Sequence, residues 1–531
     1  MGGDEMGIYL NPGDDAFREA TRSRIYVDKT LLLAYTNSVL KTNEKYLCVS
    51  RPRRFGKSMA ANMVTAYYDR TVKAEETFHG LQIAQDASFS THCNKYDVIH
   101  INMQDILSRA QDMDGLLQML TKSILWDLQE EYPDFPYFDK TDLARSMADV
   151  YQRTKRAFVV VIDEWDCVFR EYGDRKDWQE KYLDFLRSWL KDKPYIGLAY
   201  MTGILPIKKY GTHSALNMFN EYSMTNPREL TPYVGFTEEE VRLLCKNFGR
   251  DFELCKAWYD GYRFPHTGAV YNPRSVVAAM TSGIFDTYWN QTETFEALRN
   301  YIRLDIDGLR GAIISLMAGE QHKIDMGSFA NDMTSIHTAD DAMTLLVHLG
   351  YLGYDFDTKE VFIPNREIQM EYATATKSSG WNEVICAIQQ SDELLQATLA
   401  KNEAAVAKGI EEAHMEMSHL QYNDENALSY AISLAYYSAR EQYSIIRELP
   451  AGKGVADLVF IPRKQYANLP ALLIELKWGQ STDSAIRQIK EKKYAKALDA
   501  FAGKILLIGI NYDKETKKHT CKIEEWEIGK K

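Results

Sequence analysis

The sequence is poor in cysteine, and the cysteines that it has follow no ligand pattern. There are seven in 531 residues, an odd number, and none belongs to a C-x-x-C pair. Closely spaced cysteines in even number mark disulfide frameworks, and paired spacings mark structural zinc sites. We therefore expect reduced, mostly buried thiols in a cytoplasmic protein, with a fold held together by its apolar core.

Long apolar runs are also missing. The longest, residues 158–162 and 505–510, are far shorter than the roughly 20 residues that span a bilayer. The N-terminal stretch MGGDEMGIYLNPGDD is acidic and has no apolar segment, which excludes a signal peptide. Met6 stands where an N-myristoylation motif needs Ser or Thr. No membrane partner is expected.

Signatures of zinc and serine hydrolases are absent too. The 11 histidines form no H-E-x-x-H pattern, and no G-x-S-x-G occurs. The net charge of −12 excludes a generally basic surface for indiscriminate nucleic-acid binding. Charge is uneven, however: residues 441–531 hold 17 basic and 12 acidic residues, a net charge of +5. A local basic surface is therefore expected at the C-terminal end.

The first part of the chain alternates short apolar runs with helical patterns. The predicted strands are residues 46–50, 98–103, 158–163 and 196–205, and the clearest helices are residues 116–132 and 178–191. Continuous apolar strands separated by helices are typical of a parallel sheet covered on both faces. We predict a three-layer α/β P-loop domain over residues 1–234.

The rest of the chain predicts two further domains. Residues 235–378 are mainly helical and end in a hairpin at 349–365, a combination compatible with a winged helix. Residues 379–531 begin with helical pattern to about 440 and continue as a compact α/β domain. The strands expected there are residues 444–449, 454–462, 471–478 and 504–512, with a helix at 485–499.

A phosphate-binding loop follows the first predicted strand. The sequence RPRRFGKS (51–58) leads from that strand into a helix, which is the context of a Walker A motif. Arg54, Phe55 and Gly56 would form the loop around the phosphates, and Lys57 would reach the β- and γ-phosphates. The Ser58 hydroxyl would bind Mg²⁺. Arg51 stands where the first Walker glycine is usual, so the loop must turn differently.

An acidic pair lies at the end of the third predicted strand. Asp163 would hold the metal through its water shell, and Glu164 would polarise the attacking water. The alternative is a pair of capping residues after a core strand. Thr202 lies near the end of the next predicted strand, where it is equally well explained as a γ-phosphate sensor or as an ordinary strand-end residue. Asp166 has no role that the sequence suggests, and Arg53 and Arg54 either neutralise phosphate or are solvated.

Several motifs carry a family resemblance. The segments SRPRRFGKS, VIDEWD, TGILPI, GFTEEE, WYDGYRF and YNPRSV, after the N-terminal run GIYLNPGDDAFREATRSRIYVDKT, resemble the bacterial AAA-ATPase-like family. In that family an ATPase module is commonly followed by a PD-(D/E)XK nuclease-like domain, which implies a restriction-endonuclease-like α/β fold for residues 379–531. The resemblance extends over essentially the whole chain and implies that arginine is tolerated at position 51. Trp165 stands where tyrosine is more familiar.

A second acidic constellation lies near the C-terminus. Asp457 is followed 18 residues later by Glu475 and Lys477 in IELK on the next predicted strand. Strand alternation would place Glu475 and Lys477 on one face, pointing at Asp457. The two carboxylates and the Leu476 carbonyl could hold Mg²⁺, with Lys477 orienting the attacking water. The alternative is an exposed ladder of charges.

Other residues are weaker candidates. Glu425 is a possible third acid, and Arg263 is either a lid arginine or a helix-packing residue. The resemblance implies that Gln488 and Tyr494 lie on a helix beside the nuclease site, where Lys490, Lys492 and Lys493 would contact phosphates. Relatives usually have a basic residue where this chain has Val455, and Lys453 is the neighbour that would substitute.

These patterns lead to one functional hypothesis and two alternatives. The first is an ATPase that uses ATP and Mg²⁺ and is coupled to a metal-dependent nuclease acting on nucleic acid, with DNA favoured over RNA. The second is a nucleotide-switch protein whose C-terminal domain recognises DNA or a partner without cleavage. The third is a P-loop that binds nucleotide without turnover. The sequence leaves the oligomeric state open.

Overall fold

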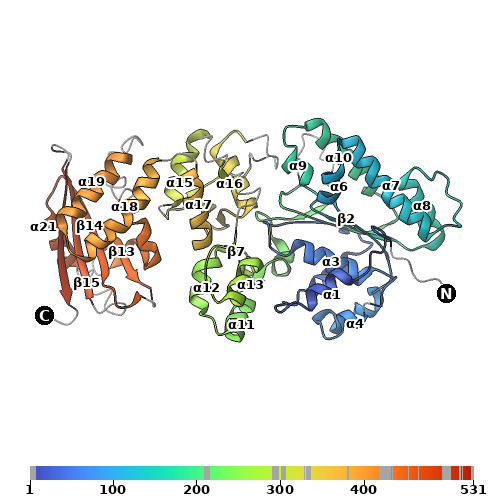
Figure 1. Ribbon diagram of the computed structural model, residues 1–531, viewed down its shortest axis with the longest axis horizontal. Helices are drawn as coiled ribbons and strands as arrows, with labels where there is room; N and C mark the ends of the chain where they lie inside the picture. Colours follow the sequence, from blue (N-terminus) through green and yellow to red (C-terminus); the bar gives the residue numbers. More distant parts are fainter. Residues whose placement is uncertain are drawn as a thin grey trace. The chain divides into compact units, whose positions relative to one another are not determined.

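The computed structural model forms two compact units: Met1–Leu298 with Lys323–Glu371, and Arg299–His322 with Tyr372–Lys531. Figure 1 follows the chain through both. The residues that the structure describes are 7–73, 75–207, 216–289, 298–299, 306–317, 319–327, 329, 336–378, 382–417, 432, 435–451, 454–463, 466–492, 504–513, 516 and 518–527. The predicted domain boundaries at 234 and 378 remain predictions.

The first unit is built on a five-stranded parallel sheet of order β2-β3-β4-β1-β5. Its strands are β1 (Tyr46–Ser50), β2 (Asp97–Asn102), β3 (Phe158–Asp163), β4 (Ile196–Gly203) and β5 (Asn220–Tyr222). Every residue of β1, β3 and β4 is buried, which explains their unbroken apolar sequence. The short edge strand β5 is polar, so the apolar pattern did not reveal it.

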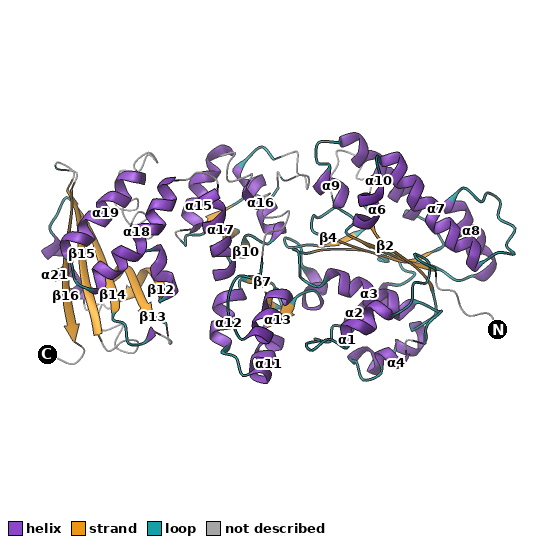
Figure 2. Ribbon diagram, in the orientation of Figure 1, coloured by secondary structure: helices purple, strands orange, loops and turns teal. Residues whose placement is uncertain are grey.

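Helices cover both faces of this sheet (Figure 2). Figure 2 shows α3 on one face and α6, α9 and α10 on the other. The helices are α1 (Asp15–Thr21), α2 (Leu31–Val39), α3 (Lys57–Tyr68), α4 (Glu75–Phe78), α5 (Phe89–His92), α6 (Met103–Arg109), α7 (Met113–Glu131), α8 (Leu143–Thr154), α9 (Cys167–Glu171) and α10 (Lys176–Leu190), with 3₁₀ turns η1 (Gln82–Gln85) and η2 (Arg228–Tyr233). The predicted three-layer α/β fold is confirmed.

The same unit contains a mainly helical part with a small sheet of order β6-β8-β7. The Thr237 hydroxyl and the Glu240 carboxylate form a capping box that starts α11. Apolar residues of α11, α12, α13 and β8 form the core of this part. Its elements are β6 (Phe236–Thr237), α11 (Glu238–Phe248), α12 (Phe252–Tyr259), β7 (Tyr262–Phe264), β8 (Gly268–Tyr271), α13 (Pro273–Ser282), α16 (Ala339–Leu349), β10 (Gly353–Asp355) and β11 (Glu360–Phe362). The predicted hairpin is the pair β10–β11.

The second unit contains a mixed sheet of order β12-β13-β14-β15-β16. Only β14 and β15 are parallel, and the crossover helix α21 joins them. Helices α18 and α19 pack on one face of the sheet and α21 on the other. The elements are η3 (Ile306–Gly308), α15 (Leu309–Met317), α18 (Asn382–Leu399), α19 (Glu403–Met417), η4 (Tyr437–Glu441), β12 (Tyr443–Ala451), β13 (Gly454–Pro462), β14 (Ala471–Trp478), α21 (Thr482–Lys492), β15 (Lys504–Asp513) and β16 (Lys518–Glu527). Helix α17 (Arg366–Ser378) and strand β9 (His322–Lys323) straddle the boundaries between the units.

Two features of this unit differ from the predicted pattern. The single helical stretch around residues 395–417 is divided into α18 and α19, because Lys401 has a left-handed φ of 56° and the Asn402 side chain accepts the Ala405 N–H. A fifth strand, β16, pairs antiparallel with β15. In the part of the chain that the structure describes, none of the helices combines the length and apolarity needed to cross a bilayer.

Candidate functional site

The loop between β1 and α3 has the shape of a phosphate-binding loop. Gly56 adopts a left-handed φ of 88°, and α3 begins at the next residue, Lys57. A side chain at position 56 would meet no neighbouring atom, so the requirement for glycine comes from the backbone conformation. The first N–H groups of α3 have no partners within the helix and can bind an anion.

Arg51 explains how the loop forms without the first Walker glycine. Its side chain is completely buried, and Nη1 donates to the carbonyls of Ser50 at 3.0 Å and Tyr222 at 3.2 Å. The guanidinium lies over the ring of Phe264, 5.2 Å from its centre. Burial lowers the pKa of Arg51 to about 10. This arginine ties β1 to β5, and it does not line the cavity described below.

Lys57 is held inside the loop. Its ammonium donates to the carbonyl of Pro52 at 3.0 Å, and the residue is only 5% exposed. Burial lowers the pKa of Lys57, while the nearby carboxylates of Glu164, Asp163 and Asp166 act in the opposite direction. The P-loop lysine and the acidic turn after β3 therefore form one electrostatic cluster.

Asp163 and Thr202 are in direct contact. Strand β4 lies between β1 and β3, so the end of β4 is next to the acidic turn. The Thr202 hydroxyl donates to Oδ1 of the buried Asp163, which also accepts the Glu164 N–H at 3.0 Å. The hydroxyl therefore fixes the orientation of the Asp163 carboxylate.

Glu164 has an uncommon backbone conformation, with a left-handed φ of 54°. Its Oε2 lies 2.6 Å from Nη2 of Arg170, whose side chain is 6% exposed. Burial raises the pKa of Glu164, and the positive charges of Lys57 and Arg170 oppose that rise. Sequence reasoning did not identify Arg170, because nothing in DEWDCVFRE shows that residues 164 and 170 meet.

Asp166 has a structural position in the same turn. Its Oδ2 accepts the backbone N–H groups of Ile204 at 3.0 Å and Leu205 at 2.7 Å. The side chain is fully buried and also lies 3.3 Å from Nε of Arg170. Asp166 thus fixes the acidic turn against the segment that follows β4.

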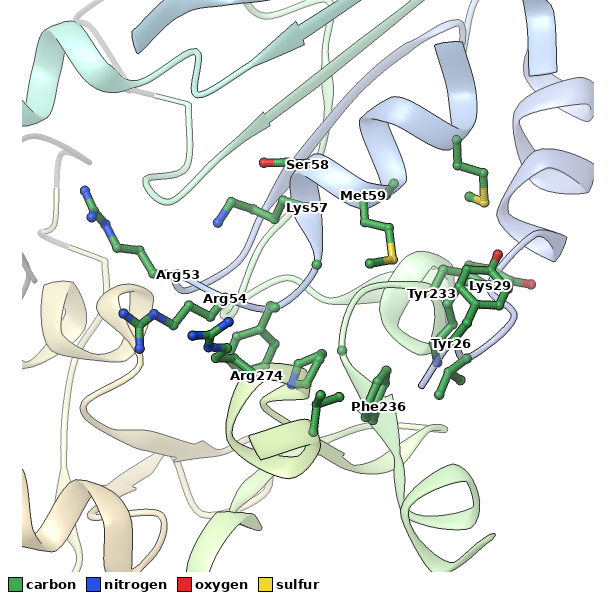
Figure 3. Close-up of a pocket in the computed structure, with 18 of the residues that line it drawn as sticks. Tyr26, Lys29, Arg53, Arg54, Lys57, Ser58, Met59, Tyr233, Phe236 and Arg274 are labelled. Atoms are coloured by element: carbon green, nitrogen blue, oxygen red, sulfur yellow. The ribbon is translucent and has the colours of Figure 1, made fainter. Parts of the chain in front are cut away.

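These elements surround a cavity of about 840 Å³ (Figure 3). Seven of the residues singled out from the sequence line it: Arg53, Arg54, Phe55, Gly56, Lys57, Ser58 and Glu164. Sequence reasoning missed the side chains that segments far from the P-loop contribute. They include Tyr26, Lys29, Arg170, Tyr233, Phe236 and Arg274. The predicted lid arginine, Arg263, is exposed on β7 and is not part of the lining.

The two ends of the cavity differ in chemistry. Figure 3 shows Arg53, Arg54 and Arg274 toward one end, and Tyr26, Tyr233 and Phe236 toward the other. Arg54 donates through Nη1 to the Tyr288 carbonyl at 2.5 Å. Burial lowers the pKa of Arg54, and the neighbouring charge of Arg274 lowers it further. One end is therefore cationic, and the other is aromatic.

The aromatic end is held together by an ion pair. Lys29 lies 2.5 Å from Glu240, the residue of the capping box that starts α11, and it also donates to the Pro232 carbonyl at 2.7 Å. This contact joins the N-terminal segment to α11, so the walls on both sides of the aromatic end are fixed to each other.

The second predicted constellation lies at the open ends of β13 and β14. The backbone ladder between these strands ends at Leu458 opposite Ile474. Beyond it, Oδ2 of Asp457 accepts the Leu476 N–H at 2.7 Å. A side-chain hydrogen bond therefore joins the two strands where the backbone hydrogen bonds between them have ended. Glu475 is 1% exposed, and its Oε1 accepts Nζ of Lys477 at 3.2 Å. Gln488 on α21 donates to the same oxygen.

The donor set here fits a divalent metal ion. Asp457 and Glu475 supply carboxylate oxygens on adjoining strands, and oxygen ligands suit Mg²⁺. Among the described residues, no three acidic, histidine or cysteine side chains gather as a ligand group. The predicted third acid, Glu425, lies outside the described residues, as do Lys453, Lys493 and Tyr494.

The other predicted residues of this region are placed as follows. Val455 lies in β13, where its backbone is opposite Pro450 of β12. Lys490 on α21 is ion-paired with Glu524 at 2.5 Å. Lys492, at the end of α21, is exposed.

Comparisons with known proteins identify two families, each matching a different part of the chain. Residues 13–212 match the family described as "Predicted AAA-ATPase", and residues 425–526 match the PD-(D/E)XK nuclease superfamily. The uncharacterized protein in the vnfD 5′ region of Azotobacter chroococcum mcd 1 is 26% identical over 298 residues. The match covers 54% of this chain and 52% of that protein, so it spans about half the length of the relative.

Two solved structures show weak similarity. The ORC2 protein of Aeropyrum pernix, in ADPNP–ADP complexes, has a TM-score of 0.30 at 12% identity and covers 69% of this chain and 98% of its own. Cdc6p from Pyrobaculum aerophilum has a TM-score of 0.24 at 10% identity, and the match covers 70% of this chain and 98% of the Cdc6p chain. Similarity at this level adds nothing to the description of the fold. The two family matches thus identify a predicted AAA-ATPase domain over residues 13–212 and a domain of the PD-(D/E)XK nuclease superfamily over residues 425–526.

Proposed function

We propose that this chain is a cytoplasmic Mg²⁺-dependent ATPase whose C-terminal domain cuts DNA in a metal-dependent reaction. The observation that carries the ATPase proposal is a single cavity lined by Lys57, Ser58 and Glu164. Its volume of about 840 Å³ is within the roughly 300–1,000 Å³ range of small-molecule sites.

The chemistry of the two ends favours a nucleoside triphosphate over other anions. Lys57, Arg53 and Arg274 offer positive charge for phosphate oxygens, and the N-terminus of α3 offers backbone N–H groups. Tyr26, Tyr233 and Phe236 provide aromatic surface for a base at the other end. A single inorganic phosphate would leave that aromatic surface without contact.

Hydrolysis requires a base beside the terminal phosphate. Glu164 lines the cavity with Lys57, and its carboxylate can accept the proton of an attacking water. Ser58 and Asp163 are the residues that would hold Mg²⁺, which supplies charge neutralisation of the phosphates when bound. The Thr202 hydroxyl fixes Asp163 for this task.

The nuclease proposal depends on Asp457, Glu475 and Lys477. The two carboxylates would hold the metal, which supplies Lewis-acid activation of the phosphodiester when bound. The Lys477 ammonium is near Glu475 and can orient the water that attacks phosphorus. Gln488 fixes the Glu475 side chain from α21. The basic character of residues 441–531 favours an acidic polymer as substrate. We propose DNA rather than RNA as that polymer.

A second function is favoured by one observation. Among the described residues, the site gathers two carboxylates and no third acid. In this alternative, the C-terminal domain recognises DNA in a nucleotide-dependent way without cutting it.

One experiment separates these functions. The purified full chain is incubated with supercoiled and linear DNA and Mg²⁺ or Mn²⁺, with and without ATP, beside the Lys477→Ala and Lys57→Ala variants. Metal-dependent cleavage that Lys477→Ala abolishes supports the nuclease. ATP-dependent DNA binding without cleavage supports the alternative, and equal cleavage by wild type and Lys477→Ala contradicts the assignment of this site.

A further inference from the structure

We propose that Arg170 is a positioning residue for ATP hydrolysis, holding the Glu164 carboxylate in the orientation from which it activates water. This inference rests on the ATPase activity proposed above and goes beyond it, because no part of the Walker motifs includes this arginine. The contact that carries it is the 2.6 Å ion pair between Nη2 of Arg170 and Oε2 of Glu164.

The backbone around Glu164 is well fixed. The Trp165 N–H donates to the Thr202 carbonyl at 3.0 Å, and the Cys167 N–H donates to the Glu164 carbonyl at 3.1 Å. These bonds hold residue 164 in its left-handed conformation, which is sparsely populated by residues other than glycine. They do not fix the glutamate side chain, which has three rotatable bonds and is orientated by what its carboxylate touches.

Arg170 is itself anchored. Its Nε lies 3.3 Å from Oδ2 of Asp166, and that oxygen also accepts the N–H groups of Ile204 and Leu205. The Arg170 side chain is 6% exposed, so its guanidinium has little freedom to reorientate. A continuous set of contacts therefore runs from the segment after β4, through Asp166 and Arg170, to Glu164.

The position of this set suits the role. Both Glu164 and Arg170 line the cavity beside Lys57 and Ser58. A general base must lie within hydrogen-bond distance of its proton, and displacement by about 1 Å can cost on the order of 100-fold in rate. An arginine that fixes this carboxylate therefore affects the chemical step more than the binding of the nucleotide.

A purely structural role for Arg170 makes a different prediction. The pair joins Arg170 to Asp166, the N-cap residue of the short helix α9, at i, i+4 spacing and could serve only to stabilise that turn. Loss of such a contact would lower stability and weaken nucleotide binding and turnover together. Loss of a positioning contact lowers kcat and leaves the dissociation constant for ATP nearly unchanged.

The test is a double-mutant cycle in the full chain. Mg-ATP hydrolysis and ATP binding are measured for wild type, Arg170→Ala, Arg170→Lys, Glu164→Gln and the Arg170→Ala/Glu164→Gln double variant. Arg175→Ala, which removes an exposed arginine paired with Asp177, is the matched control. Thermal unfolding of each variant is recorded alongside.

We expect Arg170→Ala to lower kcat by about 10- to 100-fold while the dissociation constant for ATP changes by less than about threefold. Arg170→Lys should recover part of kcat, because the ammonium retains the charge without the two-pronged geometry. In the Glu164→Gln background, Arg170→Ala should have no further effect. Arg175→Ala should match wild type.

Three results would overturn the inference while leaving the ATPase proposal intact. The first is a wild-type kcat in Arg170→Ala. The second is a loss of kcat on Arg170→Ala that is as large in the Glu164→Gln background as in wild type. The third is a loss of ATP affinity in Arg170→Ala without a loss of kcat. If Arg170→Ala does not fold, Arg170→Lys decides, since wild-type kcat or a loss of ATP affinity there also overturns it. Absence of hydrolysis by the wild-type chain would instead contradict the proposed function.

Discussion

The carboxylate of Asp457 accepts a hydrogen bond from the backbone N–H of Leu476, 2.7 Å away, on the residue that separates Glu475 from Lys477. The backbone ladder between β13 and β14 has ended one pair earlier, so the side chain of Asp457 continues the connection between the strands. This contact keeps one carboxylate beside the buried Glu475 at the end of the ladder between the strands.

Asp457→Asn should weaken metal binding and leave the fold unchanged. The amide oxygen can still accept the Leu476 N–H, but the negative charge that attracts a divalent cation is lost. We expect Mn²⁺ affinity to fall by about tenfold or more, measured by calorimetric titration. Asp483→Asn is the control, because Asp483 is exposed and paired with Lys522. Equal Mn²⁺ affinity in both variants would exclude Asp457 as a ligand.

Arg274→Ala should weaken ATP binding, whereas Arg263→Ala should not. Arg274 lines the cavity at the start of α13, and Arg263 is exposed on β7 away from the lining. Loss of one cation next to the phosphates is expected to weaken ATP binding by about tenfold, or roughly 1.4 kcal/mol. Fluorescence titration with a labelled ATP analogue measures this. A larger effect of Arg263→Ala would reverse the assignment.

Asp166→Ala should lower the stability of the first unit. The change leaves the buried N–H groups of Ile204 and Leu205 without their acceptor and removes a partner of Arg170. We expect the free energy of unfolding to fall by about 2–4 kcal/mol. Urea unfolding followed by tryptophan fluorescence provides the measurement. Asp166→Asn, which keeps one acceptor oxygen, should lose less; an unchanged unfolding midpoint in Asp166→Ala would contradict the structural role.

Glu367 should make stability depend on pH. It is 1% exposed and accepts the Tyr288 N–H at 2.6 Å and the Ser275 hydroxyl at 2.9 Å. Burial raises the pKa of Glu367 to about 7 from its usual 4.5, so the folded state retains the proton to higher pH. The stabilisation is therefore complete below pH 4.5 and is lost as pH rises to about 7, an effect of about 3 kcal/mol.

Glu367→Gln tests this directly, because glutamine keeps the shape and cannot ionise. The difference in unfolding midpoint between the variant and wild type should shift in favour of the variant between pH 5 and pH 8. Glu253→Gln on the exposed face of α12 serves as the control. A difference that does not vary with pH would show that Glu367 does not titrate in this range.

The sequence predicted most of both sheets because their strands are continuous apolar runs. The predicted bounds of β1, β3, β13 and β14 match the structure. In a strand that is buried on both faces, all side chains are mostly apolar, so the strand is seen in the sequence as one continuous apolar run. Strand β16 was not predicted, because charged residues interrupt its apolar positions. The break between α18 and α19 depends on one left-handed lysine, a conformation that composition does not reveal.

Two groups of residues in the nucleotide site could be predicted from the sequence for a different reason. Gly56, Lys57 and Ser58 are consecutive, and Asp163 and Glu164 lie at the end of a buried strand. Each group can therefore be recognised from a short stretch of sequence. Arg170 and Arg274 were not visible. They reach the cavity through the packing of α9 and α13, and contacts between distant segments leave no periodic trace in a single sequence.

Asp166 shows the same limit in the opposite direction. The sequence suggested no role for it, and its hydrogen bonds to the N–H groups of Ile204 and Leu205 show a structural one. Residue type and spacing are the same for an acid that binds a metal and an acid that binds backbone N–H groups. The partner distinguishes them, and the partner is known only from the fold.

The most direct test of the account is Mg-ATP binding and hydrolysis by the full chain, its Lys57→Ala variant and its Glu164→Gln variant. We predict that wild type binds and hydrolyses ATP, that Lys57→Ala loses binding, and that Glu164→Gln binds ATP but turns it over at least about 100-fold more slowly. Failure of the wild-type chain to bind Mg-ATP, or wild-type turnover by Glu164→Gln, would contradict it.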